Sequence, residues 1–338
     1  MKKLLTLKLS IVMSMLLMTS CAQTPSSSQA TGISSAAGAS GSESYKVAIV
    51  QLVDNGAFTE MREAFIAKMK ELGYDDSKVP YDVKNAQGDM STLNSICAQL
   101  KNSDYDLVVP IVTPATQAVV NQEIQAPVVF ISVTNPVGAG IMSSMEAPDK
   151  NATGTSNIVP VDEIFSLAEQ LTPQAKNIGI LYCSGEKNAV LTVEKAKTFF
   201  DSNSYTYQEV TVTNSSEVQQ AAQSLAGKVD AIYVPIDSTV QSAMTQVVEA
   251  ANANNIPVYG SDPVMVQSGA LACVSVSNTQ LGEKSAEMAA QILEGKNIKE
   301  IPAVALTEYQ YVVNSDTAEG LSITLPENEN LVTVQTKK

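Results

Sequence analysis

The chain has 338 residues, with 35 acidic and 21 basic side chains and a net charge of −14. An acidic chain without basic clusters argues against nucleic acid as a partner and against a charged membrane-binding patch. The sequence contains no histidine, which is the commonest general base and the commonest transition-metal ligand of proteins. We therefore expect no metal and no cofactor.

The first twenty-one residues have the pattern of an export signal. Lys2 and Lys3 precede a mostly apolar run that is too short to span a bilayer. Small residues then stand just ahead of Cys21, as in a bacterial lipobox. We expect residues 1–20 to be a signal peptide and Cys21 to carry a lipid after cleavage. An ordinary cleaved signal without a lipid is the alternative.

Residues 21–44 form a stretch that is rich in Ser, Ala, Gly, Thr and Gln. Such a composition cannot bury a core, so we expect a flexible tether. The tether would hold the rest of the chain, which begins at Tyr45, near a membrane surface through the lipid anchor only.

Three widely spaced cysteines follow Cys21 along the sequence: Cys97, Cys183 and Cys273. An odd number excludes complete internal pairing, and the sequence has no C-x-x-C motif. Single buried thiols are expected, and one disulfide among the three stays open.

From Tyr45 onward, short β-rich runs alternate with helical periods. This alternation is typical of α/β proteins, in which helices cover both faces of a parallel sheet. The sequence predicts strands at residues 47–53, 81–84, 107–112 and 128–133, and helices at 58–72, 90–102 and 115–122.

The same order of elements then starts again further along the chain. Three pairs of segments match in the same order: KVAIVQ (46–51) with KNIGIL (176–181), DLVVPI (106–111) with DAIYVPI (230–236), and Asn135-Pro136 with Asp262-Pro263. We infer that the chain folds into two similarly built Rossmann-like lobes.

The last part of the chain predicts a strand at 269–275, a helix at 279–293 and a strand at 304–313. We expect the chain to cross between the lobes near 154–158, 274–277 and 303–309. Three crossings form a hinge, which permits closure around a ligand. The expected boundaries assign residues 45–155 and 277–303 to lobe one, and residues 156–276 and 304–338 to lobe two.

Ligands bind open parallel sheets beyond the carboxyl ends of the strands, and the loops there are rich in Ser, Thr, Asn and Asp. No G-x-G-x-x-G, P-loop or G-x-S-x-G motif occurs, so nucleotide and esterase sites lack their motifs. The candidate ligand residues are Asn55, Phe58, Thr113, Ala115, Thr116, Thr134 and Asn135 in lobe one, and Ser184, Asn188, Asp237 and Asp262 in lobe two.

Two readings stay open for the polar candidates. Thr113 and Thr116 stand at the start of a predicted helix, where hydroxyls and free N–H groups bind a carboxylate or merely cap the helix. Asp237 lies between a strand and a helix, so it could bind an ammonium group or cap its own helix. Asp262 and Asn135 present the same choice at equivalent positions of the two lobes.

Other residues near these loops have simpler expectations. Phe58 follows the first strand and is expected to face the cleft between the lobes. Tyr259 is expected in the core, and Tyr182 stays open between core and cleft. Glu186 lies in a polar loop and is expected to be solvated.

Several segments resemble the ABC transporter substrate-binding protein family of the tryptophan/tyrosine type. The resemblance covers the chain from about Tyr45 to Pro326 and rests on the order and extent of its segments. These segments are VAIVQLV (47–53), NAQGD (85–89), ATQA (115–118), VTNPV (133–137), GILY (179–182), TNSSEVQQ (213–220), AIYVPIDSTV (231–240), GALA (269–272), LG (281–282) and AEMA (286–289).

The resemblance implies a type I periplasmic-binding fold, whose two lobes close over a small molecule. It also implies an aromatic amino acid as the ligand. The family pattern gives the α-carboxylate to Thr113, Ala115 and Thr116, the α-ammonium to Asp237, and further polar contacts to residues 134–135. The first loop departs from the family pattern, because DNGAF (54–58) stands where an acid and a bulky ring are usual, so the specificity stays open.

We expect a lipid-anchored, monomeric binding subunit of an ABC importer on the outer face of the cell membrane, with a permease and an ATPase as partners. A second reading is a surface adhesin or a sensor subunit that uses the same fold. A third is an enzyme, which without histidine would need a carboxylate pair such as Asp237 and Asp262, or a lysine base; we expect no enzyme. A branched-chain amino acid or another small metabolite is the alternative ligand.

Overall fold

The computed structural model describes residues 44–326 and 330–337. The predicted signal peptide, the lipidation site Cys21 and residues 21–43 of the tether lie outside the described residues. Among the described residues, no helix combines the length and the apolar character that a membrane crossing requires.

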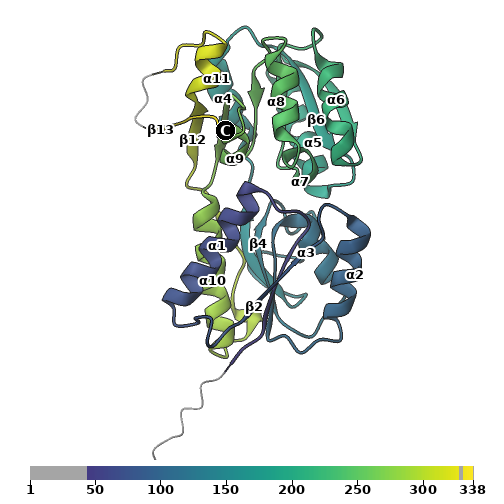
Figure 1. The fold of residues 1–338 in the computed structure, drawn as a ribbon, viewed down its shortest axis with the longest axis vertical. Coiled ribbons are helices and arrows are strands. Elements are labelled where there is room, and N and C mark those ends of the chain that lie inside the picture. The colour runs from purple at the N-terminus through teal and green to yellow at the C-terminus, as the bar shows by residue number, and fades with distance from the viewer. Residues whose placement is uncertain (1–43, 327–329, 338) are drawn as a thin grey trace, which may run out of the picture. The chain divides into compact units, whose positions relative to one another are not determined.

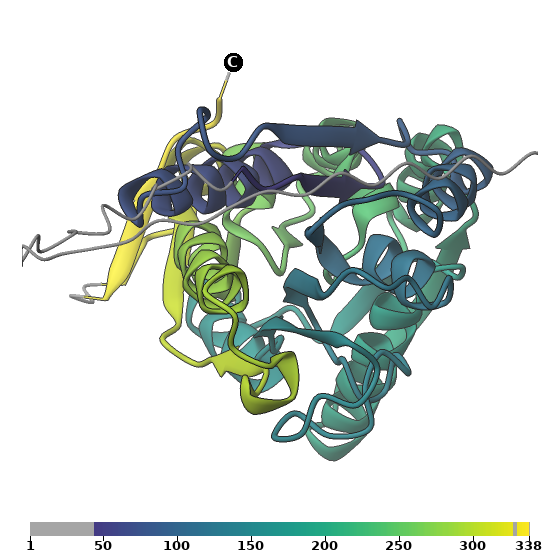
Figure 2. The ribbon, with the colours of Figure 1, turned by 90° about the horizontal axis from the view of Figure 1, so that it is seen from below.

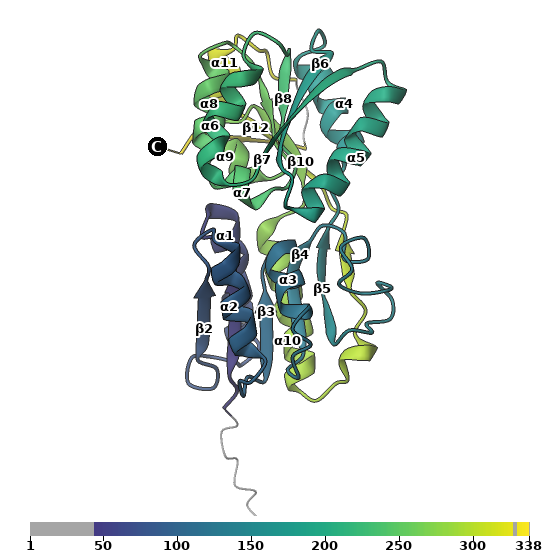
Figure 3. The same ribbon diagram turned by 90° about the vertical axis from the view of Figure 1, so that its right-hand side faces the viewer.

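Two sheets, the first parallel and the second parallel except for one strand pair, organise the chain (Figures 1 and 3). The first sheet, which defines lobe one, has the order β11-β5-β4-β3-β1-β2. Its strands are β1 (Val47–Gln51), β2 (Tyr81–Asn85), β3 (Leu107–Pro110), β4 (Val128–Val133), β5 (Ala152–Asn157) and β11 (Val304–Leu306). Its helices are α1 (Gly56–Glu71), α2 (Met90–Leu100), α3 (Val112–Val120) and α10 (Asn278–Leu293).

The second sheet, which defines lobe two, has the order β13-β12-β10-β9-β8-β6-β7. Its strands are β6 (Asn177–Cys183), β7 (Thr206–Val212), β8 (Ala231–Tyr233), β9 (Val258–Tyr259), β10 (Ala272–Ser275), β12 (Gln310–Asn314) and β13 (Leu331–Val334). Its helices are α4 (Val161–Leu171), α5 (Lys187–Ser202), α6 (Val218–Leu225), α7 (Ser238–Gln241), α8 (Met244–Asn252), α9 (Pro263–Gln267) and α11 (Ser315–Gly320). Only the β10–β12 pair is antiparallel among the strand pairs that the structure describes.

The strands of lobe one are apolar on both faces because helices cover both. Val47 and Ile49 of β1 pack in the cluster formed with α1 and α10, whereas Ala48 and Val50 pack in the cluster formed with α2 and α3. Figure 2 shows α1 and α10 together on one side of this sheet. Gly282 permits their close contact, since a Cβ atom there would lie 2.3 Å from the carbonyl oxygen of Met61.

The inferred duplication has a structural counterpart at the start of each sheet. The Asp106 carboxylate accepts a hydrogen bond from the Lys46 N–H at 2.7 Å. In lobe two, the Asp230 carboxylate accepts from the Lys176 N–H at 3.0 Å and from the Asn177 N–H at 2.8 Å. The same device therefore aligns the first and third strands of both lobes.

The chain crosses between the sheets three times, at residues 158–160, 276–277 and 307–309, close to the three predicted crossings. The first crossing follows Asn157, so residues 156–157 lie in the sheet of lobe one rather than in lobe two. The strand predicted at 304–313 is wrong as a single element. Its first part, β11, pairs with β5 in lobe one, and its second part, β12, pairs with β10 in lobe two. The last crossing thus follows Leu306, so residues 304–306 lie in the sheet of lobe one rather than in lobe two.

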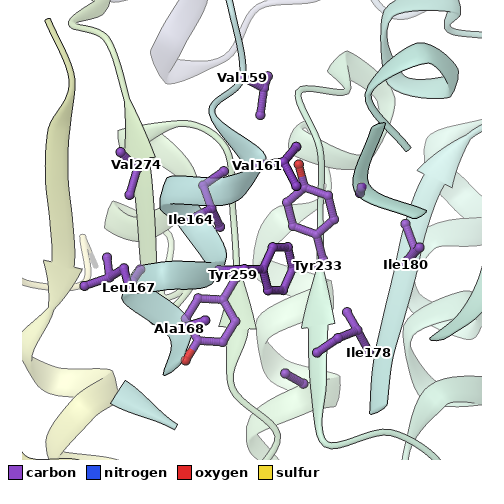
Figure 4. Packing of buried hydrophobic residues seen from close by; sticks show 14 of the residues in the cluster. Val159, Val161, Ile164, Leu167, Ala168, Ile178, Ile180, Tyr233, Tyr259 and Val274 are labelled. Atoms are coloured by element: carbon purple, nitrogen blue, oxygen red, sulfur yellow. The ribbon is translucent and has the colours of Figure 1, made fainter. Parts of the chain in front are cut away.

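One core cluster of lobe two combines aliphatic side chains with buried aromatic ones, among which Figure 4 labels Tyr233 and Tyr259. Tyr233 and Tyr259 are fully buried, and the Phe165 ring lies 5.3 Å from the Tyr233 ring, edge to face. The Tyr259 hydroxyl lies 2.6 Å from the Thr172 hydroxyl, so the predicted core position of Tyr259 is confirmed. Tyr182 packs in the same cluster and donates a hydrogen bond to Glu209 at 2.9 Å.

The expectation of single buried thiols is also met in the described part of the chain. Cys97, Cys183 and Cys273 are buried and unpaired there. Burial raises the pKa of the Cys97 thiol to about 12, and it raises the pKa of Cys273 as well.

Candidate functional site

Two cavities lie between the lobes, at the carboxyl ends of the strands. The first, which we call the hinge cavity, has a volume of about 300 Å³ and is lined by Thr134, Asn135, Pro136, Val137, Met145, Ser156, Ile158, Val159, Leu191, Thr192, Lys195 and Ala305. The second has about 330 Å³, and its walls include Pro114 and Gln117 of α3 together with Glu186 and Ser238 of lobe two. The predicted ligand loops of the two lobes therefore face each other.

Buried polar atoms without partners gather at these strand ends. Within the described residues, seven buried side-chain atoms have no hydrogen-bond partner: Asn55 Nδ2, Thr113 Oγ1, Thr134 Oγ1, Asn157 Oδ1, Asn188 Oδ1, Gln267 Oε1 and Asn278 Oδ1. Six of the seven residues lie at the end of each lobe that faces the other lobe. Asn157 ends β5 and Asn278 begins α10, while four follow strand ends: Asn55, Thr113, Thr134 and Asn188. Each such atom costs about 1–3 kcal/mol when it stays unpaired, and Thr134 is the one of these six residues that lines either of the two described cavities.

The start of α3 carries one of these atoms and is strained. Ile111 is the N-cap of α3, and among the described residues no side chain caps this helix end. The next residue, Val112, has a φ of 60°, a left-handed conformation that costs a β-branched residue about 1–3 kcal/mol. Thr113 is 1% exposed and its hydroxyl has no partner among the described residues. An uncapped helix N-terminus with a buried hydroxyl suits a carboxylate.

The other α3 candidates have different surroundings. Thr116 donates its hydroxyl hydrogen bond to the Val112 carbonyl oxygen at 2.7 Å, and Ala115 is fully buried. Thr116 therefore uses its hydroxyl within its own helix, whereas the Thr113 hydroxyl has no partner among the described residues. The sequence alone did not distinguish Thr113 from Thr116, because both stand at the start of the predicted helix.

The β4–β5 region supplies Thr134 and Asn135 to the hinge cavity. Asn135 is exposed, and its side-chain oxygen accepts from the Gly138 N–H at 2.8 Å, which closes a turn. Upstream, Ser132 has a φ of 62° where the pairing of β4 with β5 shifts register. Backbone strain thus occurs at two neighbouring strand ends of lobe one, at Val112 and Ser132.

In lobe two, Asp237 is fully buried at the N-cap of α7. One carboxylate oxygen accepts from the Val240 N–H at 2.9 Å, and the other accepts from the Cys183 N–H at 2.5 Å. Burial raises the pKa of Asp237 well above its usual range, and the nearby charge of Glu186 raises it further. A cationic group beside Asp237 would offset both effects.

Glu186 is 5% exposed, so its expected solvation is wrong. Its carboxylate accepts from the N–H groups of Ser238 at 2.9 Å and Thr239 at 2.8 Å, and from the Thr239 hydroxyl at 2.8 Å. The N-terminal turn of α7 draws this acid inward, because free N–H groups bind carboxylates. Two acids therefore share this short helix end.

Three further candidates lie as follows. The Asn188 amide donates to the Ile236 carbonyl oxygen at 2.7 Å and keeps its own oxygen unpaired. Ser184 is exposed on its loop. Phe58 is 2% exposed and packs in the lobe-one core with Met61 and Phe65, because it lies on the inner side of α1. The expected cleft position of Phe58 is therefore wrong.

Asp262 of lobe two meets residues that the sequence analysis missed. It is 4% exposed and caps α9 by accepting from the Val264 N–H at 2.8 Å. Glu60 of α1 and Asn278 of α10 lie near it, and the Asn278 amide donates to Glu60 at 3.2 Å. Burial is the first cause that raises the pKa of Asp262 to about 6, and the charge of Glu60 adds to it. The sequence feature that could have identified Asn278 is its position directly after the crossing predicted near residues 274–277.

Comparison with known proteins shows to which family the chain is similar along nearly its whole length. The family model described as ABC transporter substrate binding protein matches residues 46–337. A tyrosine-binding protein from Clostridioides difficile (strain R20291) is 35% identical over 323 residues, which cover 95% of this chain and 93% of that protein. Both matches span nearly all of the described residues.

Two solved structures of similar identity differ in how well they superpose. An ABC domain from Streptococcus pneumoniae in complex with L-Trp is 32% identical, with a TM-score of 0.82 over 84% of this chain and 97% of that one. The ligand-free, open structure of a substrate-binding protein with adhesive properties from Clostridium difficile is 36% identical, with a TM-score of 0.66 over 87% of this chain and 100% of that one. This chain thus superposes better on the L-Trp complex than on the ligand-free, open structure. The chain belongs to the ABC transporter substrate-binding protein family and has its two-lobed α/β periplasmic-binding fold.

Proposed function

We propose that this protein is the solute-binding subunit of an ABC importer and that it captures an aromatic amino acid, Tyr, Trp or Phe, between its closing lobes. The observation that carries the proposal is the group of buried, unpartnered polar atoms from both lobes and from α10. An amino acid offers a carboxylate and an ammonium group, which are complementary to such donors and acceptors. The names of the tyrosine-binding and L-Trp-bound relatives support an aromatic side chain.

The ligand carboxylate belongs at the start of α3 in this proposal. The Thr113 hydroxyl lacks a partner among the described residues, and no side chain there caps the helix. Backbone N–H groups of the first turn of α3, including that of Ala115, would donate further hydrogen bonds to the ligand carboxylate. Thr116 would support this turn from within the helix. Charge-assisted hydrogen bonds of this kind are shorter and about twice as strong as neutral ones.

The ligand ammonium belongs beside Asp237. Its two carboxylate oxygens each accept one backbone hydrogen bond, and a carboxylate oxygen has a second lone pair to offer. The buried, unpartnered oxygen of Asn188 is a further acceptor on the same lobe. A bound ammonium would relieve the repulsion that Glu186 exerts on Asp237.

The hinge cavity is the proposed place of the aromatic side chain. Its walls are largely apolar, with Pro136, Val159 and Leu191 among them, while Thr134 and Ser156 add polar groups. A cavity of about 300 Å³ lies at the lower end of the range for small-molecule sites. This size and lining favour one ring over a sugar.

The proposed cellular location rests on the sequence, and the proposed protein partners rest on the family. The predicted signal peptide and Cys21 support export and lipid anchoring at the outer face of the membrane. Membership of the family supports a permease and an ATPase as partners of a monomeric binding protein. The proposal includes no reaction, so ligand should be recovered chemically unchanged after long incubation.

An adhesive role is the second candidate function. The relative from Clostridium difficile that is 36% identical is described as having adhesive properties. Binding of purified protein to epithelial cells, with and without saturating amino acid, would separate this role from ligand capture.

A thermal-shift screen tests the proposed ligand. The purified protein is first unfolded and refolded, so that carried-over ligand is removed, and is then heated with each of the twenty amino acids. A ligand at a hundred times its Kd adds about 2.7 kcal/mol, which raises Tm by roughly 4 °C for a chain of this size. A shift confined to Tyr, Trp or Phe supports the proposal, and a shift confined to other amino acids contradicts the aromatic assignment.

A further inference from the structure

One face of α5 forms part of the wall of the hinge cavity. Leu191, Thr192 and Lys195 line the cavity, and their spacing places them on the same side of the helix. Asn188 lies one turn earlier on this side, and its amide donates to the carbonyl oxygen of the residue before Asp237. Figure 3 shows α5 of lobe two above β4 and β5 of lobe one. The face therefore leads from the proposed place of the ligand ammonium into the hinge cavity.

Lys195 gives this cavity its charge. Among the described residues that line the hinge cavity, it is the one charged side chain. Lys195 is exposed, and its ammonium group forms no ion pair within the described part of the chain. The neighbouring Lys197 pairs with Glu209 at 2.6 Å instead. Lys195 thus stands at the rim of the cavity with hydrogen-bond donors that a ligand can use.

The lobe-one side of the cavity offers a free hydroxyl. Thr134 Oγ1 is buried and has no partner among the described residues. The hydroxyls of Thr192 and Ser156 donate within the protein, to the carbonyl oxygens of Asn188 at 2.9 Å and of Thr134 at 3.4 Å. An ammonium group only donates, whereas a threonine hydroxyl both donates and accepts. A phenol oxygen, which also does both, is complementary to this pair of groups.

The spacing along α5 suits the length of a tyrosine. Lys195 follows Asn188 by two turns of the helix, a rise of about 10 Å. A tyrosine with a hydrogen bond of about 3 Å at each end, one from its ammonium group and one to its phenol oxygen, spans a comparable distance. An amino acid whose ammonium group lies beside Asp237 and Asn188 would therefore direct the far end of its ring toward Lys195.

We propose that Lys195 is the specificity-determining residue of the hinge cavity, where its ammonium group donates a hydrogen bond to the phenol oxygen of a bound tyrosine. The inference rests on the proposed function, which leaves open which of Tyr, Trp and Phe is preferred. Phenylalanine has no acceptor at this end of its ring. Tryptophan presents an indole N–H, which is a donor and cannot accept from an ammonium group. The ligand that this cavity selects is thus tyrosine.

The exposure of Lys195 sets the size of the effect. When phenylalanine is bound, the ammonium group stays hydrated, so its donors are not left unpaired in a dry site. The contact should therefore contribute a preference for tyrosine over phenylalanine of roughly three- to tenfold, as a net hydrogen bond does.

The test compares ligand preference in matched variants. Affinities for tyrosine, phenylalanine and tryptophan are measured by calorimetry for wild type, Lys195→Met, Lys195→Arg and the control Lys187→Met. Lys187 is an exposed lysine at the start of α5 that does not line the cavity. Met keeps a long apolar stem without a donor, and Arg keeps a charged donor. We expect Lys195→Met to reduce the ratio of tyrosine to phenylalanine affinity roughly three- to tenfold, Lys195→Arg to keep most of it, and Lys187→Met to leave it unchanged.

The other outcomes separate this inference from the proposed function. An unchanged ratio in Lys195→Met would overturn the role of Lys195 and leave the proposed function intact, since binding is measured in the same titrations. An equal loss for all three ligands would indicate a cation–π contact with the ring face and would also overturn the hydrogen bond. If none of the three amino acids binds to wild type, the proposed function fails, and the inference fails with it.

A tyrosine with two fluorine atoms on its ring sharpens the test, because its phenol is a stronger acid. At a pH where this phenol is ionised and that of tyrosine is not, the phenolate oxygen would accept a charge-assisted hydrogen bond from Lys195. We expect Lys195→Met to weaken binding of the fluorinated ligand more than it weakens binding of tyrosine. An equal or smaller loss for the fluorinated ligand would overturn the contact between the ammonium group and the ring oxygen.

Discussion

Gly56 and Val264 allow the closure of the lobes to be perturbed without touching a proposed ligand contact. A Cβ atom at Gly56 would lie 2.9 Å from Val264 Cγ1, whereas carbon atoms in contact prefer about 3.5–4.0 Å. The Gly56→Ala variant must therefore push the two lobes, or the Val264 side chain, apart by roughly 0.6 Å or more.

The cost falls on the closed form alone. Overpacking of this size typically costs about 1–3 kcal/mol, which corresponds to a loss of affinity of roughly 5- to 150-fold. The fold itself should not be weakened, because Gly56 is an exposed residue at the start of α1 and Ala favours helices by at most about 1 kcal/mol. Affinity and stability should therefore change in opposite directions.

The assay is calorimetric titration with the aromatic amino acid, together with chemical denaturation of the ligand-free protein. Gly320→Ala is the matched control, since a Cβ atom at Gly320 meets no described atom within 4 Å. Adding Val264→Ala to Gly56→Ala should restore affinity, because the shorter side chain makes room. An unchanged affinity in Gly56→Ala, within twofold, would refute the reasoning that closure across this contact accompanies binding.

Two further variants test the proposed ligand contacts. Thr113→Val removes a buried hydroxyl that has no partner among the described residues, so it should raise the unfolding free energy of the ligand-free protein by about 1 kcal/mol while it lowers ligand affinity roughly tenfold. Denaturation and calorimetry check both signs, and an unchanged affinity would remove Thr113 from the site. Asp237→Asn should weaken tyrosine binding roughly a hundredfold and weaken des-amino tyrosine much less, because the ammonium contact is lost only for tyrosine. The smaller loss that both ligands share comes from the amide NH2 group, which faces one of the two backbone N–H groups that the carboxylate accepts from. An equal loss for both ligands would indicate a distorted site instead.

The sequence carried enough information to predict the architecture, because the relevant forces are local. Alternation of β-rich runs with helical periods reflects burial on both faces of a parallel sheet, and the repeated Asp106 and Asp230 mark the same alignment in each lobe. The rule that ligands bind at strand carboxyl ends led to four of the buried, unpartnered groups: Asn55, Thr113, Thr134 and Asn188.

What the sequence did not predict depends on contacts that are distant along the chain. Glu60 and Asn278 are separated by 218 positions, and the packing of α1 against α10 within lobe one brings them together. Glu186 looked like a solvated loop residue, because its partner, the start of α7, lies more than fifty positions away. No local preference of valine would suggest the φ of 60° that Val112 has in the structure.

Helix phase explains the remaining differences. Phe58 was expected in the cleft because it follows a strand, but α1 begins at Gly56, two residues before it. Phe58 then lies on the same face as Met61 and Phe65, which is the face that packs on the sheet. An error of two residues in a predicted helix start thus moved one side chain from the core to the site.

A crystal structure of the complex tests the central claim most directly. The refolded protein is crystallised with whichever of Tyr, Trp or Phe gives the largest thermal shift. The account predicts that the ligand carboxylate lies within about 3 Å of the Thr113 hydroxyl, its ammonium group within about 3 Å of Asp237, and its ring in the hinge cavity. A ligand bound outside the region between the lobes, with the Thr113 hydroxyl still unpartnered, would contradict it.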